Sequence, residues 1–253
     1  MTALLELVGY CDRLLEVERF QDYCPNGLQV EGGAEVSRIV SGVTASQALI
    51  DAALAQQADL LLVHHGFFWK GEDPCLTGIK QRRMRTLLEN GISLLAYHLP
   101  LDAHPELGNN ARLAQHLGLQ EEGRFGDGHG PELACHGRLD EALDAAQLAQ
   151  RIHQVLGREA QWIAAGSDAP LQRVGWCTGA AQSYLEAAAR LGLDAFISGE
   201  ISESTVHIAR EYGLHYYAAG HHATERYGVQ ALGQQLARQF GIEHTFIDID
   251  NPV

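Results

Sequence analysis

The chain has 253 residues, and its 18 Lys and Arg against 32 Asp and Glu give a formal net charge of −14. This acidity argues against a protein that binds the phosphate backbone of nucleic acid. No stretch approaches the roughly 18 consecutive apolar residues of a membrane span, and residues 1–9 lack the features of a signal peptide, so we expect a cytoplasmic protein without a membrane partner.

The cysteines do not indicate a metal site, whereas the number of histidines does. The five cysteines are widely spaced and form no C-x-x-C pair, so we predict buried thiols in a reducing compartment and neither a disulfide framework nor a thiolate zinc site. The thirteen histidines are many for this length, and they make a metal site a reasonable expectation before any motif is considered.

The first half of the chain alternates between strand-like and helix-like patterns. In chain order, the pattern predicts a helix at 3–16, a strand at 38–43, a helix at 46–57, a buried strand that ends at 64–65, a helix at 78–89, a strand at 92–98 and a helix near 109–117. The apolar run at 60–63 lacks alternation, which is typical of a strand covered on both faces of a parallel sheet. The alternation of strands and helices predicts an α/β fold.

Residues 120–131 interrupt this pattern with a polar stretch rich in glycine, and we predict a domain boundary there. A second series then follows: a strand at 133–139, a helix at 141–156, strands near 160–165 and 172–177, a helix at 181–191, a strand at 194–200, a helix at 203–212, a strand at 215–219, a helix at 224–240 and a strand at 245–249. Gly241 is the expected C-cap of the last helix.

Histidines stand where three of the buried strands end. They are His64 with His65, His98, and His221 with His222. Ligands of α/β proteins collect just outside the carboxyl ends of the strands, so these positions favour a functional site. Because neighbouring strand residues point to opposite faces, both rings of a doublet can serve one site only if the strand ends there or if the site has two centres.

Two carboxylates complete a candidate set of metal ligands. Glu225 lies four residues after His221, so both side chains face the same side of a helix, and Asp102 lies shortly after another of the strands. With His64 and His65 the set has five members, more than one tetrahedral zinc needs. It fits two divalent ions, such as Zn, Fe or Mn, roughly 3.5 to 4 Å apart.

Each of these residues also has an ordinary structural interpretation. A single histidine at a strand end is more often a satisfied polar residue than a ligand. Glu225 also suits the first turn of a helix, where the dipole favours a carboxylate, and Asp102 also suits a turn. His98 and His222 fit catalytic acids or bases, or groups that orient the ligands, better than they fit ligands.

For two further features, a strand-end glutamate and a run of aromatic residues, we favour an ordinary structural role over a functional one. Glu200 ends a buried strand and could face the site, but a solvated loop carboxylate is the simpler interpretation. The aromatic residues Phe67, Phe68 and Trp69 could stack a base, but packing in a core or an interface explains them better.

The motifs that carry these residues resemble those of a known family. They are Asn26-Gly27-Leu28-Gln29-Val30, Leu62-Val63-His64-His65-Gly66 with Phe68-Trp69, Tyr97-His98 with Leu101-Asp102, Ile197-Ser198-Gly199-Glu200, and Gly220-His221-His222-Ala223-Thr224-Glu225-Arg226. Nearly end to end, the chain is similar to the GTP cyclohydrolase I type 2 homologues, which are toroidal hexamers with a dinuclear metal centre. The resemblance implies two divalent metal ions per subunit, held by His64, His65, Asp102, His221 and Glu225.

The resemblance also implies how the chain is organised. We expect a metal-site α/β domain made of residues 1–125 and 220–253, to which the C-terminal helix and strand return, and a second α/β domain at 126–219, with mixed or parallel sheets. Six subunits would form a homohexameric ring that encloses a cavity, with the metal sites facing the cavity.

The family name implies hydrolysis of the purine ring of GTP. Our first hypothesis is therefore a dinuclear metal-dependent hydrolase of a nucleotide-like substrate, in which His98 or His222 moves a proton. A metal site does not name a substrate, so the alternative is a non-enzymatic, metal-binding hexameric scaffold. A ring that associates with DNA is disfavoured by the net charge.

Overall fold

The computed structural model describes residues 1–126, 131–166 and 169–253. The chain divides into two units, each with its own sheet. The first unit comprises Met1–Leu107 and Arg226–Asp250, and the second comprises Gly108–Glu225 and Asn251–Val253. The predicted α/β class is confirmed, because both units combine helices with sheets that contain parallel strands.

The first unit is built on a five-stranded sheet in the order β13-β4-β5-β6-β2. Its strands are β2 (Gly27–Val30), β4 (Arg38–Thr44), β5 (Leu60–His65), β6 (Ser93–Ala96) and β13 (Glu243–Phe246). The strands β13, β4, β5 and β6 are parallel, and β2 pairs antiparallel with β6 at the edge. A separate two-stranded ribbon joins β1 (Thr2–Ala3) to β3 (Glu35–Val36). The carboxyl ends of β4, β5 and β6 therefore lie at one edge of the sheet.

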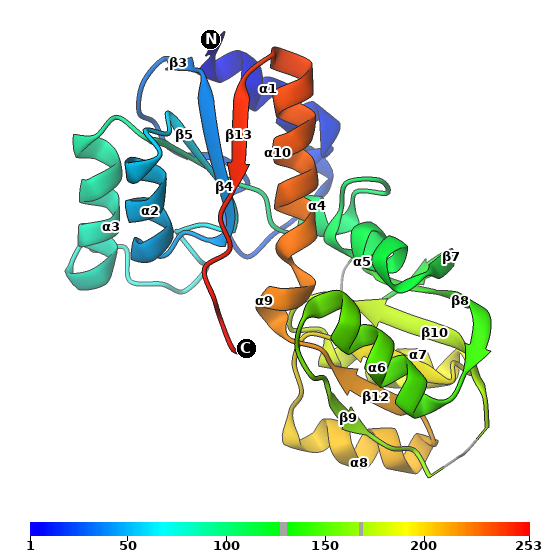
Figure 1. Cartoon of the computed structure of the whole chain (residues 1–253). Coiled ribbons are helices and arrows are strands. Elements are labelled where there is room, and N and C mark those ends of the chain that lie inside the picture. The colour runs from blue at the N-terminus through cyan, green and yellow to red at the C-terminus, as the bar shows by residue number, and fades with distance from the viewer. Residues whose placement is uncertain (127–130, 167–168) are drawn as a thin grey trace. The chain divides into compact units, whose positions relative to one another are not determined.

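Helices cover both faces of this sheet (Figure 1). They are α1 (Leu4–Leu14), η1 (Val17–Arg19), α2 (Gln47–Ala55), α3 (Gly78–Glu89), α4 (Leu99–Ala103) and α10 (Arg226–Phe240). Leu60 and Leu62 belong to the core cluster formed with α1 and α10, whereas Leu61 and Val63 belong to the cluster formed with α2 and α3. This explains the unbroken apolar run of β5, since each face of the strand is buried against a different helical layer.

The C-terminal helix and strand return to the first unit, as predicted. The strand β13 pairs with β4 in the register His244↔Ile39, and Leu232 of α10 is fully buried in the core shared with α1. Gly241 has a φ of 64° just after α10, which matches its predicted role as C-cap.

The second unit has a six-stranded sheet in the order β7-β8-β10-β11-β12-β9. Its strands are β7 (Leu119–Phe125), β8 (Ala134–Leu143), β9 (Gln161–Ile163), β10 (Leu171–Cys177), β11 (Ala195–Ser198) and β12 (His215–Ala218). Only β10, β11 and β12 are mutually parallel, so the sheet is mixed. The carboxyl ends of these three strands again share one edge.

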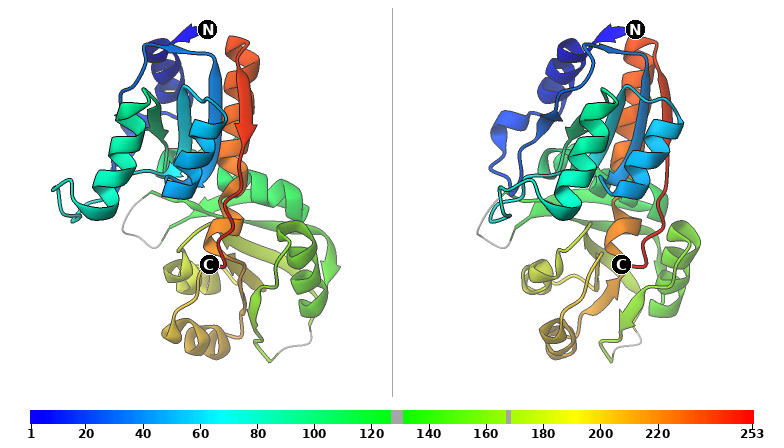
Figure 2. Two further views of the ribbon diagram at one scale, coloured as in Figure 1. Left: turned by 60° about the vertical axis from the view of Figure 1, so that its left-hand side comes forward. Right: turned by 90° about the vertical axis from the view of Figure 1, so that its left-hand side faces the viewer.

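The helices of the second unit lie on both faces of its sheet, with α6 and the pair α7 and α8 on opposite sides (Figure 2). They are α5 (Asn109–Leu117), α6 (Ala145–Leu156), η2 (Gln182–Tyr184), α7 (Leu185–Arg190), α8 (Glu203–Tyr212) and α9 (His221–Thr224). Helix α6 starts at a capping box formed by Asp144 and Gln147 and buries Leu148, Ile152 and Leu156 at helical spacing.

The division between the units falls at Leu107 and Arg226, whereas the sequence predicted boundaries at 125/126 and 219/220. Residues 119–125 form the strand β7, not a linker, and β7 pairs with β8 in the second sheet. Gly137 on β8 serves close strand approach, because a Cβ atom there would lie 1.9 Å from the carbonyl oxygen of Gln120. The part of the predicted linker at 127–130 lies outside the described residues.

Two expectations from composition can be compared with the described residues. Cys11, Cys24, Cys135 and Cys177 are buried, as predicted, but Cys75 is exposed in the loop before α3, so the prediction that all five thiols are buried is wrong. Within residues 1–126, 131–166 and 169–253, no helix has both the length and the apolar character needed to span a membrane.

Candidate metal centre

The first group of candidate ligands lies at the carboxyl edge of the first sheet. Val63 of β5 is in register with Ala96 of β6, so the residues that follow them leave the sheet side by side. Gly66 lets the chain turn away at once, because a Cβ atom there would lie 2.2 Å from Gln29 Oε1 and 2.6 Å from the Cβ atom of Ala96.

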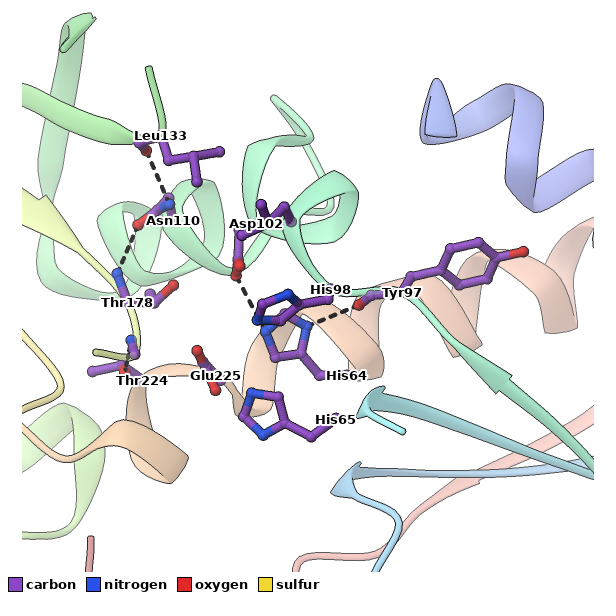
Figure 3. A network of polar contacts seen from close by, with 12 residues as sticks. His64, His65, Tyr97, His98, Asp102, Asn110, Leu133, Thr178, Thr224 and Glu225 are labelled. Carbon is purple, nitrogen blue, oxygen red and sulfur yellow. Dashed lines mark hydrogen bonds and ion pairs between the residues drawn. The ribbon is translucent and has the colours of Figure 1, made fainter. Parts of the chain in front are cut away.

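His64 and His65 both present their rings at this edge, although neighbouring residues of a strand normally face opposite ways. Their ring centroids are 4.7 Å apart because β5 ends at His65. The Nδ1 atom of His64 donates to the carbonyl oxygen of Tyr97 over 2.8 Å, and Nδ1 of His65 lies 3.2 Å from Thr44 Oγ1. In both residues the second ring nitrogen, Nε2, is thereby directed toward a shared space (Figure 3).

Asp102 belongs to the same group within the first unit. It sits in the short helix α4, where Pro100 occupies the first turn and the Asp102 amide donates to the His98 carbonyl oxygen over 3.1 Å. One carboxylate oxygen, Oδ1, lies 3.5 Å from Nε2 of His64. His64 is fully buried and Asp102 is nearly so, and a carboxylate beside an imidazole nitrogen is a donor pair that divalent metals accept.

His98 joins the two histidines of β5. One nitrogen from each of His64, His65 and His98 can be chosen so that all three lie within 4.8 Å of one another. On its other side, His98 Nδ1 is 2.7 Å from Asp22 Oδ1. Burial alone would raise the pKa of Asp22, but hydrogen bonds, above all the one from His98, lower it to about 2.

The aromatic residues after Gly66 divide between packing and the site. Phe67 is buried in the core with α2 and α3, and Phe68 packs against that core. The ring of Trp69 lies 5.1 Å from the ring of His98 and 5.8 Å from that of His65, measured between centroids. The packing interpretation therefore holds for two of the three residues, whereas Trp69 borders the histidines.

The second group of candidate ligands lies at the carboxyl edge of the parallel strands of the second unit. After β12, Gly220 takes a φ of 101° and begins the short helix α9 at His221. Nε2 of His221 lies 3.1 Å from Oε2 of Glu225, the predicted partner four residues on. Glu225 itself is buried.

Glu200 is part of this group, contrary to the expectation of a solvated loop carboxylate. Its Oε1 atom lies 2.6 Å from Nδ1 of His221. Gly199 makes the approach possible, because a Cβ atom there would lie 2.7 Å from the Cα atom of His221. A carboxylate on Nδ1 fixes the ring so that Nε2 is the nitrogen offered to a metal, which is the usual arrangement around metal-binding histidines.

The charges around His221 change its titration. Burial opposes the charged imidazolium, but the hydrogen bonds and negative charges of Glu225 and Glu200 outweigh burial and raise the pKa of His221 to about 9. A cation is therefore favoured between these carboxylates, and a divalent metal would satisfy the same electrostatic demand while displacing the proton.

A third loop of the second unit closes over these side chains. Gly179 follows β10 with a φ of 68°, and a Cβ atom there would lie 2.2 Å from Glu225 Oε1. Buried Asn110 holds the loop by donating to the Leu133 carbonyl oxygen over 3.2 Å and accepting from the Thr178 amide over 3.0 Å. The amide of Gly179 donates to Thr224 Oγ1 over 3.1 Å. Figure 3 includes this buried network.

The donor types in both units fit divalent transition metals. The first unit contributes imidazoles and a carboxylate from His64, His65 and Asp102, and the second contributes His221 and Glu225, the five residues predicted from sequence. Imidazole with carboxylate suits zinc, iron and manganese. Among the described residues, no cluster of three metal-capable side chains includes His222, whose amide donates to the Val253 carbonyl oxygen over 3.0 Å.

The comparison with known proteins places the chain in a family. Residues 2–252 match the model of Duf34/NIF3 (NGG1p interacting factor 3). The chain belongs to the Duf34/NIF3 family. A Pseudomonas aeruginosa protein named GTP cyclohydrolase 1 type 2 homolog is 58% identical over 250 residues, which are 99% of this chain and 98% of that protein. The predicted resemblance to the GTP cyclohydrolase type 2 homologues is thereby confirmed.

Two solved structures are similar to this chain over its whole length. Protein ybgI, a structural-genomics target described as of unknown function, has a TM-score of 0.95 and 50% identity, with 100% of both chains covered. The protein TTHA1606 from Thermus thermophilus has a TM-score of 0.87 and 36% identity, also over 100% of both chains.

Proposed function

We propose that this Duf34/NIF3 chain binds two divalent transition-metal ions and hydrolyses a nucleotide-like substrate. The proposed ligands are His64, His65, Asp102, His221 and Glu225. The observation that carries the proposal is that parallel strands in both units end in or are followed by a pair of imidazole and carboxylate, the buried pair His64 with Asp102 and the pair of half-buried His221 with buried Glu225.

The substrate class rests on the relatives. Several are named GTP cyclohydrolase 1 type 2 homolog, and this name supports a purine nucleotide or a molecule like it. A pair of divalent ions, when bound, supplies Lewis-acid polarisation of the electrophilic centre and a water nucleophile at neutral pH. Glu200 orients His221 through Nδ1, and Tyr97 orients His64 in the same way.

Metal content per subunit tests the first half of the proposal. Elemental mass spectrometry on protein purified without added metal or chelator should find about two transition-metal ions per chain. The variants His221→Ala and Glu225→Ala should each lose at least one of them. The exposed pair Glu203 and His207 has the same i, i+4 spacing with a 3.0 Å contact, so Glu203→Ala and His207→Ala are matched controls that should keep both ions.

Turnover tests the second half. The metal-loaded chain should release product from GTP or from another member of a nucleotide and phosphoester panel, and His221→Ala should abolish turnover. Full metal occupancy without turnover across the panel would replace the hydrolase with the alternative, a non-enzymatic metal-binding scaffold. Turnover that survives His221→Ala would contradict the proposed chemistry. The proton-transfer role predicted for His222 stays a prediction.

We also propose, on the family resemblance alone, that six copies assemble into a ring. Sedimentation equilibrium should then give six times the subunit mass of 27.6 kDa. A single species at the subunit mass would overturn the assembly without affecting the metal proposal.

A further inference from the structure

We infer that residues 251–253 form a strap that holds the turn carrying His221, and that Arg158 is the positioning residue that locks this strap. The strap is a feature of the second unit, to which residues 251–253 belong, and it lies beside α9 (Figure 1). Its effect on metal binding rests on the proposed metal centre, whereas its effect on the turn does not.

The first contact of the strap caps a helix that has no side-chain cap. Helix α9 is only four residues long and follows Gly220, which offers no side chain to the free amides of the first turn. The amide of His222, in that turn, donates to the carbonyl oxygen of Val253 over 3.0 Å. A residue distant in sequence thus supplies the acceptor that an N-cap side chain would otherwise supply.

The second contact comes from Arg158, which follows α6 in the same unit. Its Nη1 atom donates to the carbonyl oxygen of Pro252 over 2.8 Å. A Cβ atom on Gly220 would lie 2.4 Å from Nη1 and 2.7 Å from Cζ of Arg158. The guanidinium group therefore lies directly against the backbone of Gly220 and joins the strap to the turn. Because the donor is charged, this hydrogen bond is stronger than one between neutral groups.

The strap is bent so that both of these carbonyl oxygens reach their donors. The amide of Val253 donates to Oδ1 of Asn251 over 3.0 Å, which closes an Asx turn. Pro252, between them, has no amide hydrogen and a φ fixed at about −65°. The side chain of Asn251 and the ring of Pro252 favour the bent form before the strap closes, so less conformational entropy is lost on closing.

The strap can open without unfolding the second unit. Residues 251–253 are exposed, and segments with exposed hydrogen bonds and little buried apolar surface open locally at low cost in free energy. The strands β11 and β12, which lead toward the turn, are buried throughout. We therefore expect the loss of the strap to affect the turn and to leave the sheet intact.

The turn matters because His221 lies at its centre, between the two residues that the strap and its lock hold. Arg158 lies against Gly220, and the strap accepts the amide of His222. The ring of His221 is oriented by Glu200 through Nδ1. A carboxylate can direct the ring only as well as the backbone beneath it is fixed, so we infer that the strap sets where Nε2 points.

Hydrogen exchange of the His222 amide measures how often the strap opens. In the full chain, Arg158→Ala should speed the exchange of this amide by at least about tenfold and Asn251→Ala by about fivefold, while the amides of β11 and β12 keep their rates. Arg158→Lys keeps a charged donor for the carbonyl oxygen of Pro252 and should recover part of the protection. Titration with Zn²⁺ should show an affinity at least about threefold weaker in Arg158→Ala.

Two matched controls separate the strap from general effects of the substitutions. Arg151, in α6, also donates to a backbone carbonyl oxygen, that of Leu117. Asp73 accepts from the amide of Cys75 in an Asx turn of the first unit. Arg151→Ala and Asp73→Ala should leave both the exchange of the His222 amide and the affinity for Zn²⁺ unchanged.

Unchanged exchange of the His222 amide in Arg158→Ala would overturn the inference, as would faster exchange spread over the whole second sheet. Faster exchange at the turn with unchanged Zn²⁺ affinity would overturn the positioning role of Arg158. If Arg158→Ala does not fold, Asn251→Ala gives the same readout at an exposed position. A chain that binds no Zn²⁺ in any variant would contradict the proposed function instead, and the exchange of the His222 amide would then decide the strap by itself.

Discussion

Glycine at position 179 illustrates how single residues shape the candidate metal centre. Its φ of 68° and its distance to Glu225 leave no room for a side chain. Gly213, with a φ of 67°, has no atom within 4 Å of the Cβ position. A substitution at either glycine therefore brings a similar backbone strain. Of the two, only Gly179 lies against a proposed ligand.

We predict that Gly179→Ala lowers the metal affinity of the chain at least tenfold, because the new methyl group must displace the Glu225 carboxylate. Gly213→Ala should cost a similar amount of stability, about 1 kcal/mol, and leave metal binding intact. Isothermal titration with Zn²⁺ or Mn²⁺ on both variants measures the difference. Equal affinities in the two variants would contradict the placement of Glu225.

The lowered pKa of Asp22 predicts that the chain loses stability at low pH. Its folded-state pKa of about 2 lies below the ordinary value of 3.8, so its contribution is fully present above pH 4 and is lost as the pH falls toward 2. The shift corresponds to roughly 2 kcal/mol of unfolding free energy. Denaturant titrations of the metal-free chain at several pH values between 4 and 2 should show this loss. Asp22→Asn should give a flatter profile, and an unchanged slope would refute the assignment.

Sequence reasoning found some of these residues and missed others for a physical reason. His221 and Glu225 are four residues apart, so helical geometry alone predicted that they meet. The contact between Asp22 and His98 joins residues 76 positions apart, and no local period encodes it. Glu200 could have been suspected, since it follows a parallel strand next to the one that precedes His221, but its contact depends on the small size of Gly199.

At the scale of elements, most helices and strands follow from their apolar periods. The strand β5 and the helices α3, α5 and α8 were predicted to within a residue or two of their observed ends. The failures occurred where tertiary pairing overrides composition. The glycine-containing stretch that forms β7 is held by β8, and the predicted helix from 224 to 240 is interrupted at Glu225, between α9 and α10. The interruption falls on a proposed ligand, where local regularity gives way to the site.

Helix α10 should contribute strongly to the stability of the first unit. Leu232 has no exposed surface and packs in the core with α1. We predict that Leu232→Ala lowers the unfolding free energy of this unit by about 2 to 5 kcal/mol. Hydrogen exchange of the β4 and β5 amides in increasing denaturant measures the unfolding free energy of the first unit. Gln239 is an exposed position of the same helix. The control variant Gln239→Ala should change the unfolding free energy by less than about 0.5 kcal/mol.

At the scale of the whole molecule, the alternation of strands and helices gave the α/β class and two units, but the family resemblance was needed for the return of the C-terminal segment. Pattern alone does not say which sheet a terminal strand joins, because β13 is short and only half buried. Its pairing with β4 is decided by the packing of α10 against the core that it shares with α1.

This organisation predicts how fragments behave. Residues 1–107 alone should be insoluble or molten, since they lack the helix α10 and leave β4 as an open sheet edge. The same residues joined by a flexible Gly/Ser linker to residues 226–250 should fold cooperatively. Circular dichroism with thermal melting compares the two. A cooperative melt of residues 1–107 without the C-terminal segment would contradict this account.

Because the first unit is made of two separate segments, its folding depends on the order in which the ribosome synthesises them. Residues 108–225, which include every strand of the second sheet, are synthesised between the two parts of the first. At typical elongation rates, making this stretch takes on the order of ten seconds. For that time the nascent first sheet has one flank uncovered and is a natural client for chaperones. The segment made first is thus completed last, and folding order runs opposite to the order of translation.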